Sequence, residues 1–156
     1  MSYEISQNDN AEKLVCNNIA DSLEKQKIPI RLSCISQNGY PLVISLWFKI
    51  SNGKILCATR PTAKIVKYLS NNNLCGFEIA SDKSPYRGIR GQGTCQIKQN
   101  DGKKVLELLI SKYLGDSDSK LKHFLMQKAD DEVALEITPM HIFQYDYSKR
   151  MGDIIL

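Results

Sequence analysis

Several features that narrow the search for a function are missing from this sequence of 156 residues. No run of eighteen apolar residues is present, so the sequence predicts no membrane-spanning helix. The five cysteines are odd in number and none is spaced as Cys-x-x-Cys, which argues against a metal site and favours reduced, buried thiols. Segment 1–9 is polar and lacks the apolar stretch of a signal peptide. Together these absences predict a cytoplasmic protein without a bound metal.

Motifs of the common enzyme classes are also missing. There is no Gly-x-Ser-x-Gly, no Walker loop and no His-Glu-x-x-His, and the only two histidines, His123 and His141, are expected to be structural or exposed. The glycines of segment 88–93 have the wrong order for a dinucleotide loop and strand-like flanks where an RNA-binding KH loop has helices. A net charge of +4 permits an anionic ligand without the dense basic stripe of nucleic-acid binders. The sequence therefore identifies no catalytic residue and predicts no nucleic-acid partner.

What the sequence does contain is a series of short apolar runs separated by turn signals. Helical spacing predicts helices over 10–27 and 61–71, with two more around 105–113 and 121–125. Alternation and β-branched residues predict strands over 30–37, 42–50, 54–59, 74–80, 86–99, 132–138 and 141–147. Glycines at 88, 91 and 93 favour a sharp bend or the close approach of another group. This order predicts a mainly β domain with helices (α+β), a closed or nearly closed antiparallel barrel spanning 1–156.

The stretch from 42 to 71 carries the strongest functional signal. The predicted strand 42–50 has one apolar face, expected in the core: Leu42, Ile44, Leu46, Phe48 and Ile50. Its other face is mixed, as at a ligand site or a subunit contact: Val43, Ser45, Trp47 and Lys49. After the next strand, Arg60 and Lys64 lie at the start of a predicted helix, whose N–H groups and dipole already favour an anion.

A single phosphate is within reach of both cations if they lie about one helical turn apart. Thr59 or Thr62 adds a hydroxyl, and Arg87 and Arg90 are further candidates for the same ligand or for a substrate. The alternative is a solvated basic helix end. On these residues alone, the sequence predicts an anion site next to a sheet and does not identify the anion.

Four segments together resemble one known family. Residues 41–48, the Asn52-Gly53 turn, 58–64 and 86–93 are similar to the pyridoxamine 5′-phosphate oxidase-like proteins, the flavin-binding split-barrel family, and 137–150 resembles its closing strands. The resemblance implies an antiparallel split β-barrel that forms a homodimer with two flavin mononucleotides (FMN) at the interface. It also implies the cofactor-binding residues: Ser45, Leu46, Trp47 and Phe48 at the ring, Ala58 and Thr59 along the ribityl chain, Arg60, Thr62 and Lys64 at the phosphate, and Arg90 and Gln92 from the partner subunit.

The function implied is that of an FMN-dependent oxidoreductase acting on a small molecule, with the flavin supplying the chemistry. Trp47 either contacts the ring or anchors the dimer. Pyridoxamine phosphate oxidation is not expected, because the C-terminal part lacks a match to the oxidase's substrate-phosphate residues. Two alternatives remain open: a deazaflavin-dependent reductase of the same fold, with Lys49, Lys67 or Arg87 near the cofactor's acidic tail, and a non-catalytic stress-response module that holds flavin or haem.

Overall fold

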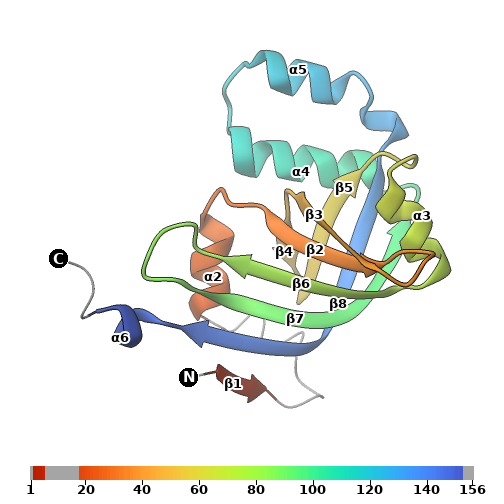
Figure 1. Cartoon of the computed structure of the whole chain (residues 1–156). Coiled ribbons are helices and arrows are strands. Elements are labelled where there is room, and N and C mark those ends of the chain that lie inside the picture. The colour runs from red at the N-terminus through yellow and green to blue at the C-terminus, as the bar shows by residue number, and fades with distance from the viewer. Residues whose placement is uncertain (1, 6–17, 153–156) are drawn as a thin grey trace.

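One antiparallel sheet organises the part of the chain that the computed structural model describes, residues 2–5 and 18–152. Its strands are β1 (Ser2–Ile5), β2 (Ile30–Ile35), β3 (Pro41–Leu46), β4 (Lys49–Ser51), β5 (Lys54–Thr59), β6 (Leu74–Ala80), β7 (Arg87–Lys98) and β8 (Val133–Asp146). The helices are α2 (Asn18–Lys25), α3 (Lys64–Asn71), α4 (Gly102–Leu114), α5 (Lys120–Met126) and α6 (Ser148–Met151), with a short 3-10 turn η1 (Ala129–Asp131). Figure 1 shows α4 and α5 stacked beyond one end of the sheet.

The sheet closes on itself through a very short connection. Its strand order is β3-β2-β6-β7-β8-β5-β4, and β1 pairs with β8. The two edge strands, β3 and β4, are consecutive in the chain and are separated only by Trp47 and Phe48. Two residues span only a few ångströms, so the two edges of the sheet must come together. The result is a barrel, as the sequence predicts.

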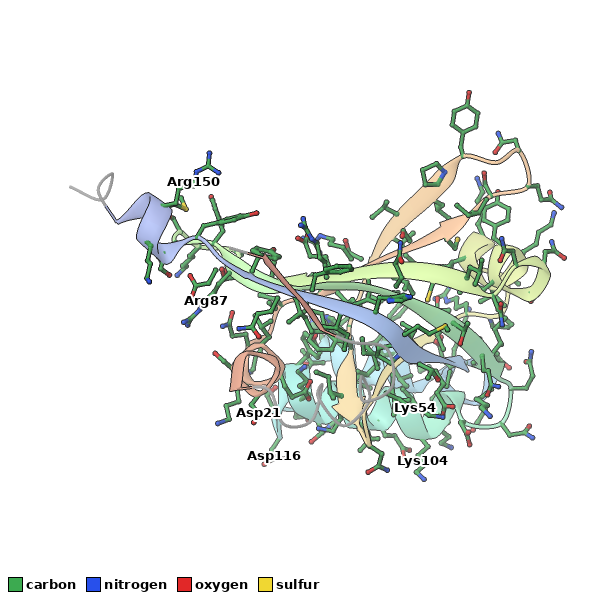
Figure 2. The ribbon with its side chains drawn as sticks, turned by 90° about the horizontal axis from the view of Figure 1, so that it is seen from below. Asp21, Lys54, Arg87, Lys104, Asp116 and Arg150 are labelled. Atoms are coloured by element: carbon green, nitrogen blue, oxygen red, sulfur yellow. The ribbon has the colours of Figure 1, made fainter. Side chains whose placement is uncertain are left out.

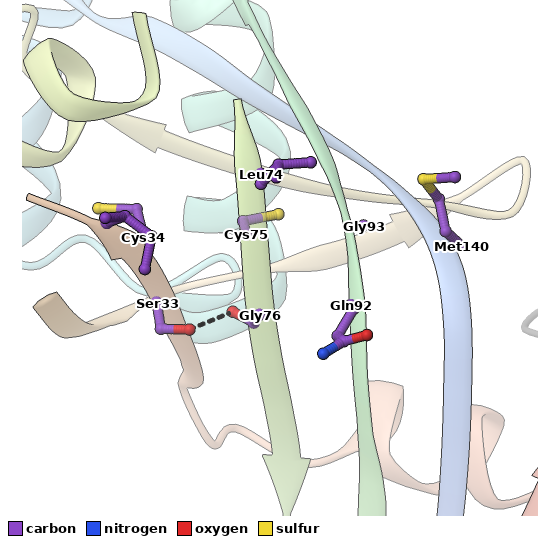
Figure 3. A pocket seen from close by; sticks show the side chains of 9 residues that line it. Ser33, Cys34, Leu74, Cys75, Gly76, Gln92, Gly93 and Met140 are labelled. Atoms are coloured by element: carbon purple, nitrogen blue, oxygen red, sulfur yellow. Dashed lines mark hydrogen bonds between the residues drawn. The ribbon is translucent and has the colours of Figure 1, made fainter. Parts of the chain in front are cut away.

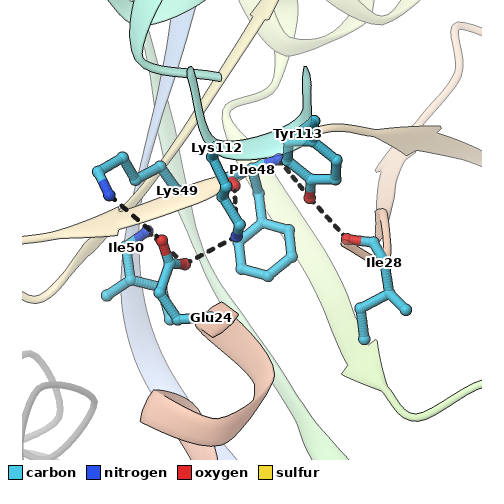
Figure 4. A network of polar contacts seen from close by, with 7 residues as sticks. All are labelled: Glu24, Ile28, Phe48, Lys49, Ile50, Lys112 and Tyr113. Carbon is cyan, nitrogen blue, oxygen red and sulfur yellow. Dashed lines mark hydrogen bonds and ion pairs between the residues drawn. The ribbon is translucent and has the colours of Figure 1, made fainter. Parts of the chain in front are cut away.

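The structure corrects one prediction at Trp47 and Phe48, because the expected strand 42–50 is interrupted there and forms two strands, β3 and β4. At this point the chain leaves β2 and begins to pair with β5, so the backbone of Phe48 has no strand partner. Side chains of α4 replace the missing ladder: Phe48 N donates to Tyr113 Oη (3.3 Å), and Lys112 Nζ donates to Phe48 O (2.9 Å) (Figure 4). Buried backbone groups are satisfied in this way at little net cost.

The same two α4 residues also connect the segment between β3 and β4 to α2 and to the residues that follow α2. Lys112 Nζ pairs with a Glu24 carboxylate oxygen at 3.0 Å, and that carboxylate also accepts from Ile50 N at 3.1 Å and lies 3.5 Å from the Lys49 ammonium (Figure 4). The Tyr113 hydroxyl donates to Ile28 O at 2.6 Å. Each charge in this cluster has an opposite charge or a polar partner, which is the condition for burying ionic groups in a stable fold.

Alternate residues of the strands fill the barrel interior, which is continuous with the buried faces of α2 and α3. The largest fully buried side chains of the described residues are Leu23, Ile30, Leu32, Phe48, Ile55, Ile65, Ile79, Ile89, Leu109, Leu135 and Ile137. Four cysteines in the described residues are free and buried, as expected, and burial raises the pKa of the Cys75 and Cys95 thiols to about 12. Cys16 lies outside the described residues.

The longest pairing joins β7 to β8 along their whole lengths. The sequence predicts two strands separated at Pro139, but the structure has one strand that passes through it. The register shifts between Gln92, which pairs with His141, and Gly93, which pairs with Pro139, so Met140 is the extra residue of a β-bulge. A bulge accommodates the missing proline N–H. A Cβ on Gly93 would collide with Thr138 O, so a close backbone approach, as predicted, explains this glycine.

One smaller prediction needs correction, and two further points concern the N-terminal part of the chain. The helix expected from Pro61 begins at Lys64, because a turn closed by Ala63 N donating to Arg60 O (3.0 Å) precedes it. Strand β1 has no counterpart in the sequence-based expectations. Of the helix expected over 10–27, the structure places α2 at Asn18–Lys25, and residues 10–17 lie outside the described part.

Beyond the barrel, β7 and β8 continue as a ribbon. Figure 2 shows Arg87 and Arg150 at the far end of this ribbon, away from the α4 region that carries Lys104. No helix in the described residues is both long and apolar enough to cross a membrane.

Candidate functional site

A cavity of about 440 Å³ lies between the ends of β3 and β5 and the two helices α4 and α5. This volume is in the range of small-molecule sites. Seven of the cofactor-binding residues predicted from the sequence line it: Ser45, Leu46, Trp47, Ala58, Thr59, Arg60 and Thr62. The remaining walls come from Ala63, Leu106, Leu109, Leu121, Leu125 and Glu132. The two halves of the 42–71 segment, a strand and the loop before a helix, therefore meet around one space.

Trp47 gives the cavity a fixed aromatic wall. Its indole stacks on the ring of Tyr113, with the ring centroids 4.8 Å apart and the planes inclined by 6°. Tyr113 is itself held by the hydrogen bonds of its hydroxyl to Ile28 O and Phe48 N. Stacking restricts rotation of the indole, so Trp47 presents the same surface to any ligand in the cavity.

The polar end of the cavity carries unpaired charges. Among the described residues, neither Arg60 nor Lys64 has a carboxylate within ion-pair distance. Lys64 begins α3, where no side chain caps the backbone N–H groups. Lys64 is exposed and outside the cavity lining, but its neighbour Ala63 is part of that lining. Two cations and an uncapped helix start thus lie at one end of the cavity, and all three attract an anion.

A second cavity of about 370 Å³ adjoins this end. It shares Arg60, Thr62 and Glu132 with the first cavity and adds Pro61, Lys128 and Asp131. The shared residues make the two spaces neighbours, with Arg60 and Glu132 at their junction. A ligand longer than the first cavity therefore has a polar extension available.

Glu132 is the functional candidate that sequence reasoning missed. It immediately precedes β8, and because Thr59 of β5 pairs with Val133 of β8, the register brings Arg60 and Glu132 to the same end of the two strands. Burial raises the pKa of the Glu132 carboxyl, while Arg60 lowers it and Asp131 raises it. No motif marks this residue, since its position beside Arg60 depends on a strand pairing between distant segments.

One wall of the cavity is apolar and is built from α4 and α5. Leu106 and Leu109 of α4 are buried, whereas α5 has no buried residue. Leu121 of α5 lines the cavity although it is 46% exposed, and its neighbour Phe124 is 55% exposed. The cavity thus has a polar, charged end and an apolar wall that solvent reaches.

Besides Lys64, which lies next to the lining, three predicted residues do not line this cavity within one chain. Phe48 is fully buried in the barrel core. Arg90 is exposed on the outer face of β7, with its guanidinium 5.7 Å from the centroid of the Tyr145 ring. Gln92, two residues along the same face, lines a separate cavity of about 420 Å³ (Figure 3).

This third cavity lies on the outer surface of the sheet. Gln92 and Met140 are on one side, and on the other the Ser33 hydroxyl donates to Gly76 O at 3.2 Å (Figure 3). Several exposed apolar residues belong to the same group of strands and their turns: Ile35 (42%), Tyr40 (71%), Val43 (60%), Leu74 (57%) and Met140 (49%). We call these five residues the outer apolar face. Exposed apolar groups of this kind mark interaction surfaces.

Comparison with known proteins gives a fold. No protein-family model and no curated protein matches the sequence. Solved structures do match. An F420 reductase superposes with a TM-score of 0.66 at 16% identity, over 78% of this chain and 94% of its own. An FAD-binding protein from Mesorhizobium loti gives 0.62 at 13% identity, over 94% and 96% of the two chains. A putative pyridoxamine 5′-phosphate oxidase from Listeria innocua gives 0.61 at 12% identity, over 86% and 96%.

The chain has the split-barrel fold of the pyridoxamine 5′-phosphate oxidase-like proteins. The fold class predicted from the sequence is therefore confirmed. In this split barrel the described residues contain no cluster of three His, Cys, Asp or Glu side chains suited to a metal ion. Its most distinctive functional feature is the cavity beside Arg60 and Lys64, two cations without an ion pair in the part of the chain that the structure describes.

Proposed function

We propose that this split barrel binds flavin mononucleotide in the cavity beside Trp47 and serves as a flavin-dependent oxidoreductase. The observation that carries the proposal is a fixed indole wall in the same cavity as Arg60, next to the uncapped helix start at Lys64, with neither cation in an ion pair within the described residues. A flat ring with a phosphate tail matches this arrangement. The similarity in fold to an FAD-binding protein and to an F420 reductase supports a flavin-type cofactor.

Each residue then has a defined role. The Arg60 guanidinium and the Lys64 ammonium bind the phosphate, and the Thr59 or Thr62 hydroxyl donates to one of its oxygens. Trp47 and Ser45 lie against the ring and orient it. The α4 and α5 leucines form the apolar wall of the same cavity and stay available to a second ligand. When bound, FMN supplies the hydride or electron transfer, so that no side-chain acid or base is required for that step.

The positions of Arg90 and Gln92 favour a homodimer. They lie on the outer surface of the sheet, next to the outer apolar face, and reach a cofactor cavity only if a second subunit contributes them. We therefore propose that the outer apolar face is the dimer interface. Val43→Glu, at a site 60% exposed, is expected to give monomers in sedimentation velocity. The matched substitution Lys67→Glu, exposed on α3, is expected to leave the dimer intact; a wild-type monomer would contradict the proposal.

Purification without added cofactor tests the cofactor assignment. We expect a yellow protein with flavin absorbance close to one equivalent per subunit, released on denaturation as FMN. A colourless protein that takes up a deazaflavin but not FMN would replace FMN with the deazaflavin cofactor. A Soret absorbance would indicate haem. Bound FMN that no nicotinamide donor or substrate panel reduces would indicate a flavin-holding module without turnover.

A further inference from the structure

Glu132 is a charged residue to which the proposed FMN site gives no role, and it lies where the first and second cavities meet. Among the described residues, it is the only acidic one that lines the larger of these two cavities. Within the described residues its carboxylate has no ion pair within 4.0 Å, not even with Arg60. A site built only to hold an anion gains nothing from a carboxylate in its wall, because like charges repel there. Glu132 therefore requires an explanation of its own.

The surroundings of Glu132 indicate what it recognises. On one side are the apolar residues of α4 and α5, including Leu121 and Leu125. On the other are Arg60 and, in the second cavity, Asp131 and Lys128. If Arg60 is engaged by a phosphate, the carboxylates of Glu132 and Asp131 outnumber the one remaining cation, Lys128, so a cation is the complementary partner. The apolar wall meanwhile offers burial to a ring or chain.

We propose that Glu132 selects the substrate of this site, and that the substrate is an apolar, ring-bearing amine. Its ammonium group lies against the Glu132 carboxylate and its ring packs on the leucines of α4 and α5. The inference rests on the proposed function in one respect, namely that the same cavity is the ligand site. It goes beyond that function in giving the chemical class of the molecule and the residue that selects it.

Matched ligands and matched variants test the proposal. The ligands are 2-phenylethylamine and 2-phenylethanol, which share a ring and differ in charge, measured by isothermal titration calorimetry with protein as purified and again saturated with FMN. The variants are Glu132→Gln and Asp131→Asn, which change net charge equally but differ in that only Glu132 lines the larger cavity. Thermal unfolding checks that each variant is folded, and Glu132→Ala replaces the glutamine variant if that one is not.

In wild type we expect the amine to bind about tenfold more tightly than the alcohol, as for a charged hydrogen bond. Glu132→Gln is expected to remove this preference and Asp131→Asn to keep it. Equal affinities in wild type, binding of neither compound, or a preference that survives loss of Glu132 would each overturn the inference. Binding of FMN is measured in a separate titration, so that the two proposals can fail independently. An amine preference that depends on Glu132 in a protein unable to bind FMN would retain this inference and reject the proposed cofactor.

Discussion

Two groups of charged residues lie close to α4, and their pairing differs. Lys112, Glu24 and Lys49 form a connected network in which the Lys112 side chain is only 9% exposed. Arg60, Lys64 and Glu132 are at the cavity end and have no ion pair within the described residues. The first group holds the crossing between the edge strands together. The second leaves its charges available, which is expected of a ligand site and is unfavourable for one with no ligand.

The largest effect is expected from breaking the paired group. Lys112→Met leaves Glu24 without its closest cation and Phe48 O without a donor. Removing one partner of a buried pair exposes the full cost of burying the other, so we expect the free energy of unfolding in urea to fall by about 3 kcal/mol. Lys103→Met is the control, because the Lys103–Asp130 pair is exposed, and no resolvable change is expected there. Equal effects of the two substitutions would contradict the structural role of Lys112.

A smaller loss is expected from Tyr113→Phe. The ring that stacks on Trp47 is kept, while the hydroxyl that joins Ile28 O to Phe48 N is removed. Leaving these buried groups unsatisfied is expected to cost about 1–2 kcal/mol in the same urea experiment. Tyr86→Phe, at a tyrosine 46% exposed and outside the outer apolar face, serves as the matched control and should leave the midpoint unchanged.

Alkaline pH probes the same hydroxyl. Burial raises the pKa of Tyr113 to about 12, although its hydrogen bond with the Phe48 backbone opposes this. Between the ordinary tyrosine pKa near 10 and this raised value, the folded state keeps a proton that the unfolded state loses. Stability contributed by Tyr113 is therefore complete below pH 10 and falls as pH rises toward 12, by about 1.4 kcal/mol per pH unit.

The pKa of Lys112 is lowered by burial and changes stability in the opposite direction over alkaline pH. The difference between wild type and Tyr113→Phe, measured by urea unfolding from pH 9 to 11, isolates the tyrosine. The stabilities of the two proteins should converge as pH rises. A difference that is constant with pH would show that the hydroxyl does not titrate as this structure requires.

The smallest effect on stability is expected in the unpaired group. Arg60→Ala removes an exposed side chain with no ion pair in the described residues, so the free energy of unfolding without ligand should stay within about 0.5 kcal/mol of wild type. A loss as large as that of Lys112→Met would show that Arg60 is structural. The comparison between the two groups would then fail.

Local signals predicted the regular parts of this structure well. β5 and β6 have the predicted bounds because turn residues flank each run, and Asn52 and Gly53 have the positive φ values (51° and 72°) that a tight hairpin turn needs. All seven predicted cofactor residues that line the first cavity come from one stretch, 45–62, which is why the sequence alone found them.

Features that depend on distant residues were not predictable from local patterns. The break at Phe48 is held by Lys112 and Tyr113, far along the chain, so alternation through 42–50 gave no warning of it. Glu132 is beside Arg60 only through the register of β5 with β8. Pro139 is tolerated inside a strand because a bulge at Met140 absorbs it, and bulges leave no trace in a hydrophobic pattern.

Titration with FMN tests the central claim most directly, because Trp47 is the only tryptophan of the chain and lines the proposed site. Quenching of its fluorescence should report binding to the cofactor-free protein. We expect saturable quenching in wild type, affinity at least about tenfold weaker in Arg60→Ala, and unchanged affinity in the control Lys103→Ala. Wild-type protein that does not bind FMN, or Arg60→Ala protein that binds it as tightly as wild type, would contradict the account.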